Sequence, residues 1–174
     1  MNSVQPIFTD INHICVVTGD VERAIRVWAD RYGFGPWSVY TKDATNMSAL
    51  VDGEPTEFAI RVALANVSPT FRIELIQPLD ERSPYSDSLA RHGGADHVHH
   101  LRFDVADYDG AGARLAELGR RRLLDAAFDG APGVGEKFLG TYYDTERELG
   151  FVVEIGHAPP GFRMPPPELV YPDG

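Results

Sequence analysis

The sequence contains a single cysteine, Cys15, among 174 residues. One thiol cannot form an internal disulfide, a CxxC redox pair or a thiolate-rich zinc site, so we expect Cys15 to be a small buried apolar residue. Long apolar runs are also missing, because no stretch approaches the roughly 20 residues of a membrane-spanning helix. The first ten residues, MNSVQPIFTD, lack the basic-then-apolar pattern of a secretory signal. We therefore expect no membrane contact and a cytoplasmic location.

Basic residues are scarce: 16 Lys and Arg stand against 26 Asp and Glu, which gives a formal net charge of -10. Nucleic-acid binders concentrate Lys and Arg on one face, and the single basic run here, residues 120–122, is too short to form such a face. The balance predicts no nucleic-acid partner and leaves a small molecule as the expected ligand. The acidic surplus is typical of a solvated exterior.

What is present is ordinary globular composition, with 43% apolar and 24% charged residues in a chain long enough for one core. We expect a single domain over residues 1–157. The remaining residues, 158–174, contain six prolines and should form an extended arm with no core of its own.

The chain contains an internal repeat, which is the strongest signal in the sequence. A segment that starts at His13 can be laid over one that starts at His100 without a gap until the last residue, and the matching pairs are Asp20 with Asp107, Ala24 with Ala111, and Gly33 with Gly119. Later in each half a short apolar segment carries one acid, Glu74 in FRIEL and Glu154 in FVVEI. Each half therefore begins with a histidine strand and ends with a glutamate strand.

Apolar and polar residues alternate with period two around these four residues, which predicts strands. After His100, the residues Leu101, Phe103 and Val105 point one way, whereas His100, Arg102 and Asp104 point the other. The same alternation places His13, Glu74 and Glu154 opposite apolar faces. All four are therefore expected on the sheet face that does not pack against helices.

The predicted fold class is α+β, with two βαβββ modules forming a bowl-shaped mixed sheet that carries helices on its convex side. The modules should cover residues 8–80 and 96–157, and a linker helix over residues 84–94 should join them. Asp20 and Asp107 are typical helix N-caps. Further strands are expected from Phe58 to Ala65 and from Lys137 to Tyr143.

This plan resembles the vicinal oxygen chelate superfamily, which includes glyoxalase I, methylmalonyl-CoA epimerase, extradiol dioxygenases and bleomycin-resistance proteins. The strand starts Asn12-His13-Ile14 and His99-His100-Leu101 and the two glutamates carry the resemblance. The stretch from Ile73 to Leu79 is most similar to methylmalonyl-CoA epimerases, whereas the Tyr142-to-Glu146 segment departs from their usual Pro-Lys step. The resemblance implies one metal ion held by His13, Glu74, His100 and Glu154, and it implies a homodimer.

Two imidazoles and two carboxylates form a mixed nitrogen and oxygen set that suits divalent Zn, Co, Ni, Mn or Fe. Six-coordinate geometry would leave two positions for a substrate with two chelating oxygens. Such an ion would stabilise an enolate, so the expected chemistry is removal of a proton next to a carbonyl group by a positioned base.

Two carboxylates are candidate bases. Glu154 could act as a labile ligand, and Glu57 is expected to begin the strand that precedes the Glu74 hairpin. Glu54 is an alternative to Glu57. Trp37, Tyr142 and Arg102 are candidates for substrate binding, although Trp37 and Tyr142 could equally be core residues and Arg102 could equally pair with Asp104.

Four functions remain open on the sequence. The favoured one is an isomerase or epimerase similar to methylmalonyl-CoA epimerase, and the first alternative is a glyoxalase I-type lyase acting on a glutathione hemithioacetal. An extradiol-type dioxygenase is disfavoured by a fourth ligand at Glu74, and a non-catalytic binding protein is disfavoured by the intact ligand set.

Overall fold

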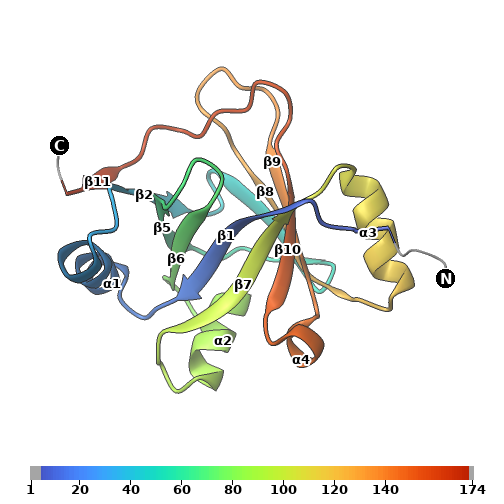
Figure 1. Ribbon diagram of the computed structural model, residues 1–174, viewed down its shortest axis with the longest axis horizontal. Helices are drawn as coiled ribbons and strands as arrows, with labels where there is room; N and C mark the ends of the chain where they lie inside the picture. Colours follow the sequence, from blue (N-terminus) through green and yellow to red (C-terminus); the bar gives the residue numbers. More distant parts are fainter. Residues whose placement is uncertain (1–4, 173–174) are drawn as a thin grey trace.

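The computed structural model describes residues 5–172 and is shown in Figure 1. Its helical segments are α1 (Val21–Arg26), the π-helical turn η1 (Val27–Arg31), α2 (Pro84–Arg91), α3 (Tyr108–Glu117) and α4 (Glu146–Leu149). Its strands are β1 (Asp10–Val17), β2 (Trp37–Lys42), β3 (Met47–Val51), β4 (Glu54–Pro55), β5 (Ile60–Asn66), β6 (Arg72–Pro78), β7 (His97–Asp104), β8 (Arg122–Phe128), β9 (Phe138–Tyr143), β10 (Val152–His157) and β11 (Leu169–Tyr171). Among the described residues, no helix is both long and apolar enough to cross a membrane.

The described strands form one curled mixed sheet in the order β11-β2-β5-β6-β1-β7-β10-β9-β8-β3-β4. β1 pairs with β6 in parallel, β7 pairs with β10 in parallel, and β1 and β7 join the two halves in antiparallel fashion. The repeat in the sequence therefore corresponds to two equivalent sets of four strands, β1-β2-β5-β6 and β7-β8-β9-β10. The expected α+β bowl is confirmed.

Helices α1 and α3 cover the convex side of the bowl, one beside each half of the sheet (Figure 1). The side chain of Asp20 caps α1 by accepting from the Arg23 amide, and that of Asp107 caps α3 by accepting from the Gly110 amide. Apolar residues of α1 pack on β2, β5 and β6, and those of α3 pack on β9 and β10. The linker helix α2 instead inserts Tyr85 into the apolar cluster inside the bowl.

A hairpin of β3 and β4 is an addition to the expected plan. It lies between β2 and β5 in the chain, but β3 pairs with β8 of the other half, with Met47 opposite Phe128. The hairpin therefore extends the second half of the sheet with residues of the first. The strand expected to start at Phe58 starts at Ile60 instead.

The proline-rich arm is also more ordered than expected. After the prolines at 165–167 it forms β11, which pairs with the edge strand β2 and places Tyr171 opposite Trp37. Glu168 accepts hydrogen bonds from the amide and hydroxyl of Thr41, and Tyr171 packs against the cluster beneath α1. In Figure 1 this segment, coloured red, crosses the top of the view to reach β2. The arm thus contributes to the first half of the fold.

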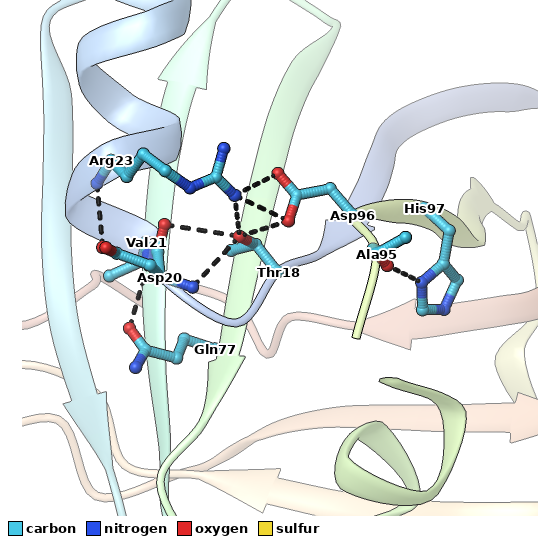
Figure 2. A network of polar contacts seen from close by, with 8 residues as sticks. All are labelled: Thr18, Asp20, Val21, Arg23, Gln77, Ala95, Asp96 and His97. Atoms are coloured by element: carbon cyan, nitrogen blue, oxygen red, sulfur yellow. Dashed lines mark hydrogen bonds and ion pairs between the residues drawn. The ribbon is translucent and has the colours of Figure 1, made fainter. Parts of the chain in front are cut away.

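A polar network ties the start of α1 to the start of β7 (Figure 2). Arg23 donates to both carboxylate oxygens of Asp96 at 2.8 and 2.6 Å, and the Thr18 hydroxyl donates to Asp96 at 2.8 Å. The side chain of Gln77, in β6, accepts from the amide of Val21 at 3.0 Å. These bonds join the ends of β1, β6 and β7, the three strands that carry His13, Glu74 and His100.

Candidate metal centre

Strand register places the candidate site residues in two adjacent rows across β6, β1, β7 and β10. In the first row, the Cα partners in order are Arg72, His13, Arg102 and Glu154. In the second row they are Glu74, Cys15, His100 and Val152. Because partners in neighbouring strands point to the same face of a sheet, both rows project into the bowl. Each row supplies one imidazole and one carboxylate.

The four side chains meet at one point. The Nε2 atoms of His13 and His100 are 3.2 Å apart. Oε2 of Glu74 lies 3.3 and 3.2 Å from these two nitrogens, and Oε2 of Glu154 lies 3.2 and 3.1 Å from them. Atoms that bind one Zn²⁺ at about 2.0–2.1 Å are about 2.9–3.4 Å from their neighbours in tetrahedral or octahedral geometry. The observed spacing fits a shared cation.

Hydrogen bonding alone does not satisfy the two carboxylates. Both Oε2 atoms are buried and, among residues 5–172, have no hydrogen bond of acceptable geometry, although imidazole nitrogens lie close to them. Unpaired charged oxygens in a buried site are costly, and a metal ion is a usual way to pair them. The side chain of His100 is fully buried, whereas that of Glu74 is 12% exposed. One possible ligand atom from each of His13, Glu74 and His100 lies within 4.8 Å of the other two.

Burial and the charges within the cluster shift the pKa values of its members. Burial alone would lower the pKa of His13, but the charge of Glu74 and a contact with Glu154 raise this pKa from 6.5 to about 9. The pKa of His100 is also raised, because Glu154 and Glu74 outweigh burial. Burial would raise the pKa of Glu154, yet the two imidazoles hold it at about 2. These shifts favour positive charge between the carboxylates, supplied by protons or by a metal ion.

The second nitrogen of His100 has a defined partner. Its Nδ1 lies 3.0 Å from Nδ1 of His99. When Nδ1 of neutral His100 carries the proton and donates it to this hydrogen bond, Nε2 has no proton. This is the tautomer in which Nε2 can bind a metal. Burial and the neighbouring His100 lower the pKa of His99, which keeps it neutral and able to accept. His99 is not one of the four expected ligands, and its ring contacts that of His100.

A pocket opens from this cluster toward the rim of the bowl. His13, Glu74 and Glu154 lie in its wall, together with the expected substrate-binding residues Arg102 and Tyr142. Most of the remaining lining is aliphatic or aromatic and comes from both halves and the arm: Tyr40, Ile60, Val62, Leu64, Ile76, Tyr85, Phe128, Phe138 and Met164. Lys42 and Arg72 complete it. An apolar pocket with a few convergent polar groups is typical of a small-molecule site.

Two glycines leave room for the charged groups. Gly140 and Gly156 are Cα partners in β9 and β10. A Cβ atom on Gly140 would lie 2.9 Å from Oε1 of Glu154, and one on Gly156 would lie 2.6 Å from Nε of Arg102. The absence of side chains at both positions therefore allows Glu154 and Arg102 to lie against the sheet.

Three expected site residues lie elsewhere. Trp37 is fully buried in the cluster beneath α1, on the convex side, and does not line the pocket. Glu57 and Glu54 are exposed and also lie outside the pocket lining. Glu57 precedes β5 and is exposed, whereas its neighbour Phe58 is buried in the apolar cluster inside the bowl.

Sequence reasoning missed two cations of the pocket, Arg72 and Lys42. Arg72 could have been found, since it precedes Glu74 by two residues on the same strand and therefore shares its face. Lys42 gave no comparable signal, because its strand was not assigned to the pocket wall.

The raised pKa of His13 predicts a pH dependence of stability. Below pH 6.5 the stabilising charge on His13 is fully present, and it is lost as the pH rises through about 9. Since one pKa unit corresponds to about 1.4 kcal/mol, chelator-treated protein should lose at least about 1 kcal/mol, or a few degrees in Tm, over this range. Thermal melts at pH 6–9.5 with EDTA or with cobalt(II) would test this. A Tm in EDTA that is flat or rises would contradict it, and His13→Gln should reduce the slope without removing it, because the pKa of His100 is also raised.

Comparisons with known proteins agree with this arrangement. A family model described as the Glyoxalase/Bleomycin resistance protein/Dioxygenase superfamily matches residues 12–138. No curated protein matches the chain. Among solved structures, methylmalonyl-CoA epimerase from Mycobacterium tuberculosis is 20% identical with a TM-score of 0.60, and the match covers 94% of this chain and 91% of that one.

Two further structures show the same similarity of fold. A Streptomyces coelicolor methylmalonyl-CoA epimerase variant in complex with 2-nitronate-propionyl-CoA is 21% identical, with a TM-score of 0.63 and coverage of 89% of this chain and 98% of that one. A hypothetical protein from Bacillus halodurans is 16% identical, with a TM-score of 0.56 and coverage of 85% and 93%. At these identities the likeness concerns the fold.

Proposed function

Because this chain belongs to the glyoxalase/bleomycin resistance protein/dioxygenase superfamily, we propose that it is a metal-dependent isomerase or epimerase. The proposed reaction removes a proton from the carbon next to a carbonyl group and returns it. The observation that carries the proposal is the convergence of two imidazole nitrogens with two buried carboxylate oxygens that lack hydrogen-bond partners among residues 5–172.

His13, Glu74, His100 and Glu154 would hold one divalent ion. The nitrogen and oxygen donors suit Zn, Co, Ni, Mn or Fe, and the set contains no thiolate. Bound there, the ion would supply Lewis-acid stabilisation of the negative charge that develops when the proton leaves. The protein's own contribution is to place a small substrate with two chelating oxygens against the ligands and to exclude water with the apolar pocket wall.

Glu154 is the proposed proton acceptor. Its Oε2 faces the imidazoles, while its Oε1 lies over Gly140 at the pocket wall. Its pKa, held at about 2 by the imidazoles, keeps the carboxylate ionised. Glu57 is not proposed for this role, because it is exposed and outside the pocket lining.

An epimerase needs a second proton-handling group on the other side of the substrate, and Lys42 supports this part of the proposal. It belongs to β2, in the half of the sheet that does not carry Glu154, and it lines the same pocket. The residue is 5% exposed and forms no ion pair with the rest of the described chain. Burial lowers the pKa of its amine, so the neutral amine forms more readily than in a free lysine, which favours a role in proton transfer.

Methylmalonyl-CoA is the substrate proposed for the first test, since several structures of similar fold are methylmalonyl-CoA epimerases. Cobalt(II)-loaded protein incubated with racemic methylmalonyl-CoA in deuterated water should incorporate deuterium at the α-carbon, as measured by mass spectrometry. EDTA treatment should lower the rate at least about 100-fold, and added cobalt should restore it. Lys42→Met should slow exchange, whereas Lys137→Met, at an exposed lysine outside the pocket, should not.

A parallel assay with the hemithioacetal of methylglyoxal and glutathione distinguishes the lyase alternative. Conversion of this adduct without exchange of methylmalonyl-CoA would replace the epimerase proposal with a glyoxalase I-type reaction. No conversion of either compound by metal-loaded protein would contradict both. A homodimer is proposed only by similarity to the superfamily, and sedimentation analysis would test it.

A further inference from the structure

The pocket is rich in positive charge although the protein is acidic. Its charged lining consists of three cations, Lys42, Arg72 and Arg102, and the carboxylates Glu74 and Glu154. The two carboxylates balance the divalent ion proposed for this site, so the three cations remain in excess. The formal net charge of the whole chain is -10, so this concentration of positive charge runs against the bulk composition. A pocket of this kind attracts anions.

The two arginines stand directly beside the candidate metal centre. Arg72 and Arg102 are the Cα partners of His13 on its two sides, in β6 and β7. Neighbouring strands lie about 4.8 Å apart, so each arginine starts one strand spacing from the histidine and points to the same face. Both arginine side chains line the pocket that opens from this cluster.

Arg102 is held in place by packing but has no hydrogen-bond or ion-pair partner among residues 5–172. The Phe138 ring lies 4.5 Å from its guanidinium carbon, and the backbone of Gly156 passes close to its Nε. This Nε is buried and donates no hydrogen bond within residues 5–172. A buried donor on a positioned guanidinium is costly unless a ligand accepts from it.

Arg72 is also held in place, but only part of its guanidinium group forms hydrogen bonds with the described residues. Its Nη2 donates to the side-chain oxygen of Asn12, and the amide nitrogen of Asn12 donates to Asp104 at 3.1 Å. Asn12 thus separates Arg72 from the nearby carboxylate, and no ion pair forms between Arg72 and any described acid. The other donors of the guanidinium have no partner among the described residues.

We infer that Arg72 and Arg102 form a carboxylate-binding subsite next to the metal centre, so that the substrate carries an acid group in addition to its two chelating oxygens. This inference rests on the proposed function, because it names the class of substrate for the same site. Arginine suits the role, since its planar fork donates to both oxygens of a carboxylate. The substrate class is a small acid with an apolar part, which fits the aliphatic and aromatic remainder of the wall.

Matched ligands test the subsite without requiring turnover. The probes are 2-oxoglutarate and 2-oxoadipate, each compared with the neutral amide of its distal carboxylate, because the chelating 2-oxo acid group is the same within each pair. Binding to cobalt(II)-loaded protein is measured by calorimetry, and chelation is followed in the visible spectrum of cobalt. At least one diacid should bind at least about tenfold more tightly than its amide, which corresponds to about 1.4 kcal/mol.

The variants locate the effect. Arg72→Met and Arg102→Met should remove the preference for the diacid, and Gly156→Ala should weaken it by displacing the Arg102 guanidinium. Arg114→Met, at an exposed arginine of α3 paired with Glu117, should retain it. Cobalt uptake by each variant shows that its site is folded.

The outcomes separate this inference from the proposed function. Chelation with equal affinities for every diacid and its amide would overturn the subsite and leave the metal centre standing. A preference that persists in both Arg→Met variants would also overturn it. Failure of the wild-type protein to take up cobalt would instead overturn the proposed function, and the subsite with it.

Discussion

Replacing His100 with alanine should reduce affinity for the divalent ion by more than about 100-fold. His100 is fully buried, and its Nε2 is within 3.2 Å of the three other candidate ligand atoms. Loss of even an outer partner of a ligand typically costs 10–100-fold in metal affinity, so loss of a ligand should cost more. His13→Ala should have a similar effect, because its Nε2 contacts the same two carboxylates.

Competition with a chelating dye at fixed pH gives the affinities. His157→Ala is the matched control, since His157 is an exposed residue in β10, the strand that also carries Glu154. This control should bind cobalt as the wild-type protein does. Equal affinities for all three variants would mean that the imidazoles inside the bowl are not ligands.

Trp37→Ala should destabilise the protein by roughly 3–5 kcal/mol, the usual cost of removing a large buried aromatic side chain. Trp37 is fully buried among Val39, Ile25 and Leu75, and its indole donates to the carbonyl of Phe34 at 2.7 Å. The substitution therefore leaves a cavity and an unpaired carbonyl oxygen between α1 and the sheet.

Urea denaturation with and without cobalt would measure this loss. Because Trp37 lies on the convex side and outside the pocket lining, folded Trp37→Ala protein should keep its cobalt affinity. Tyr32→Ala is a useful control for an aromatic of the same region, since Tyr32 is 66% exposed and should change stability little. If Trp37→Ala had normal stability but no longer bound ligand, this result would mean that Trp37 lines the pocket.

Much of the fold followed from the sequence because the two halves repeat the same physical pattern. Alternation around His100 predicted that Arg102 faces the inside of the bowl. The matching alternation around Glu74 and Glu154 predicted the same for these two residues. These patterns are local, so one strand at a time suffices to read them. The repeat then indicated that the strands assemble twice in the same way, which the parallel pairs β1-β6 and β7-β10 confirm.

The missed features depend on contacts between distant segments. Pairing of β3 with β8 joins residues about half a chain apart, and β11 joins the end of the chain to β2. Nothing local in the short Leu169–Tyr171 segment specifies its partner strand. Glu57 is a different case, since it lies before β5, is exposed and is not among the residues that line the pocket.

The central claim is that four side chains, two imidazoles and two carboxylates, hold one metal ion inside the bowl. X-ray absorption spectroscopy of protein loaded with one equivalent of zinc tests it most directly, because imidazole, carboxylate and thiolate ligands give distinct signals. We predict two histidine ligands with the remaining ligands oxygen, at about 2.0–2.2 Å. Cys15 lies between Glu74 and His100 in the same row, so a sulfur ligand near about 2.3 Å is the natural competing result. A sulfur ligand, or fewer than two imidazoles, would contradict the account.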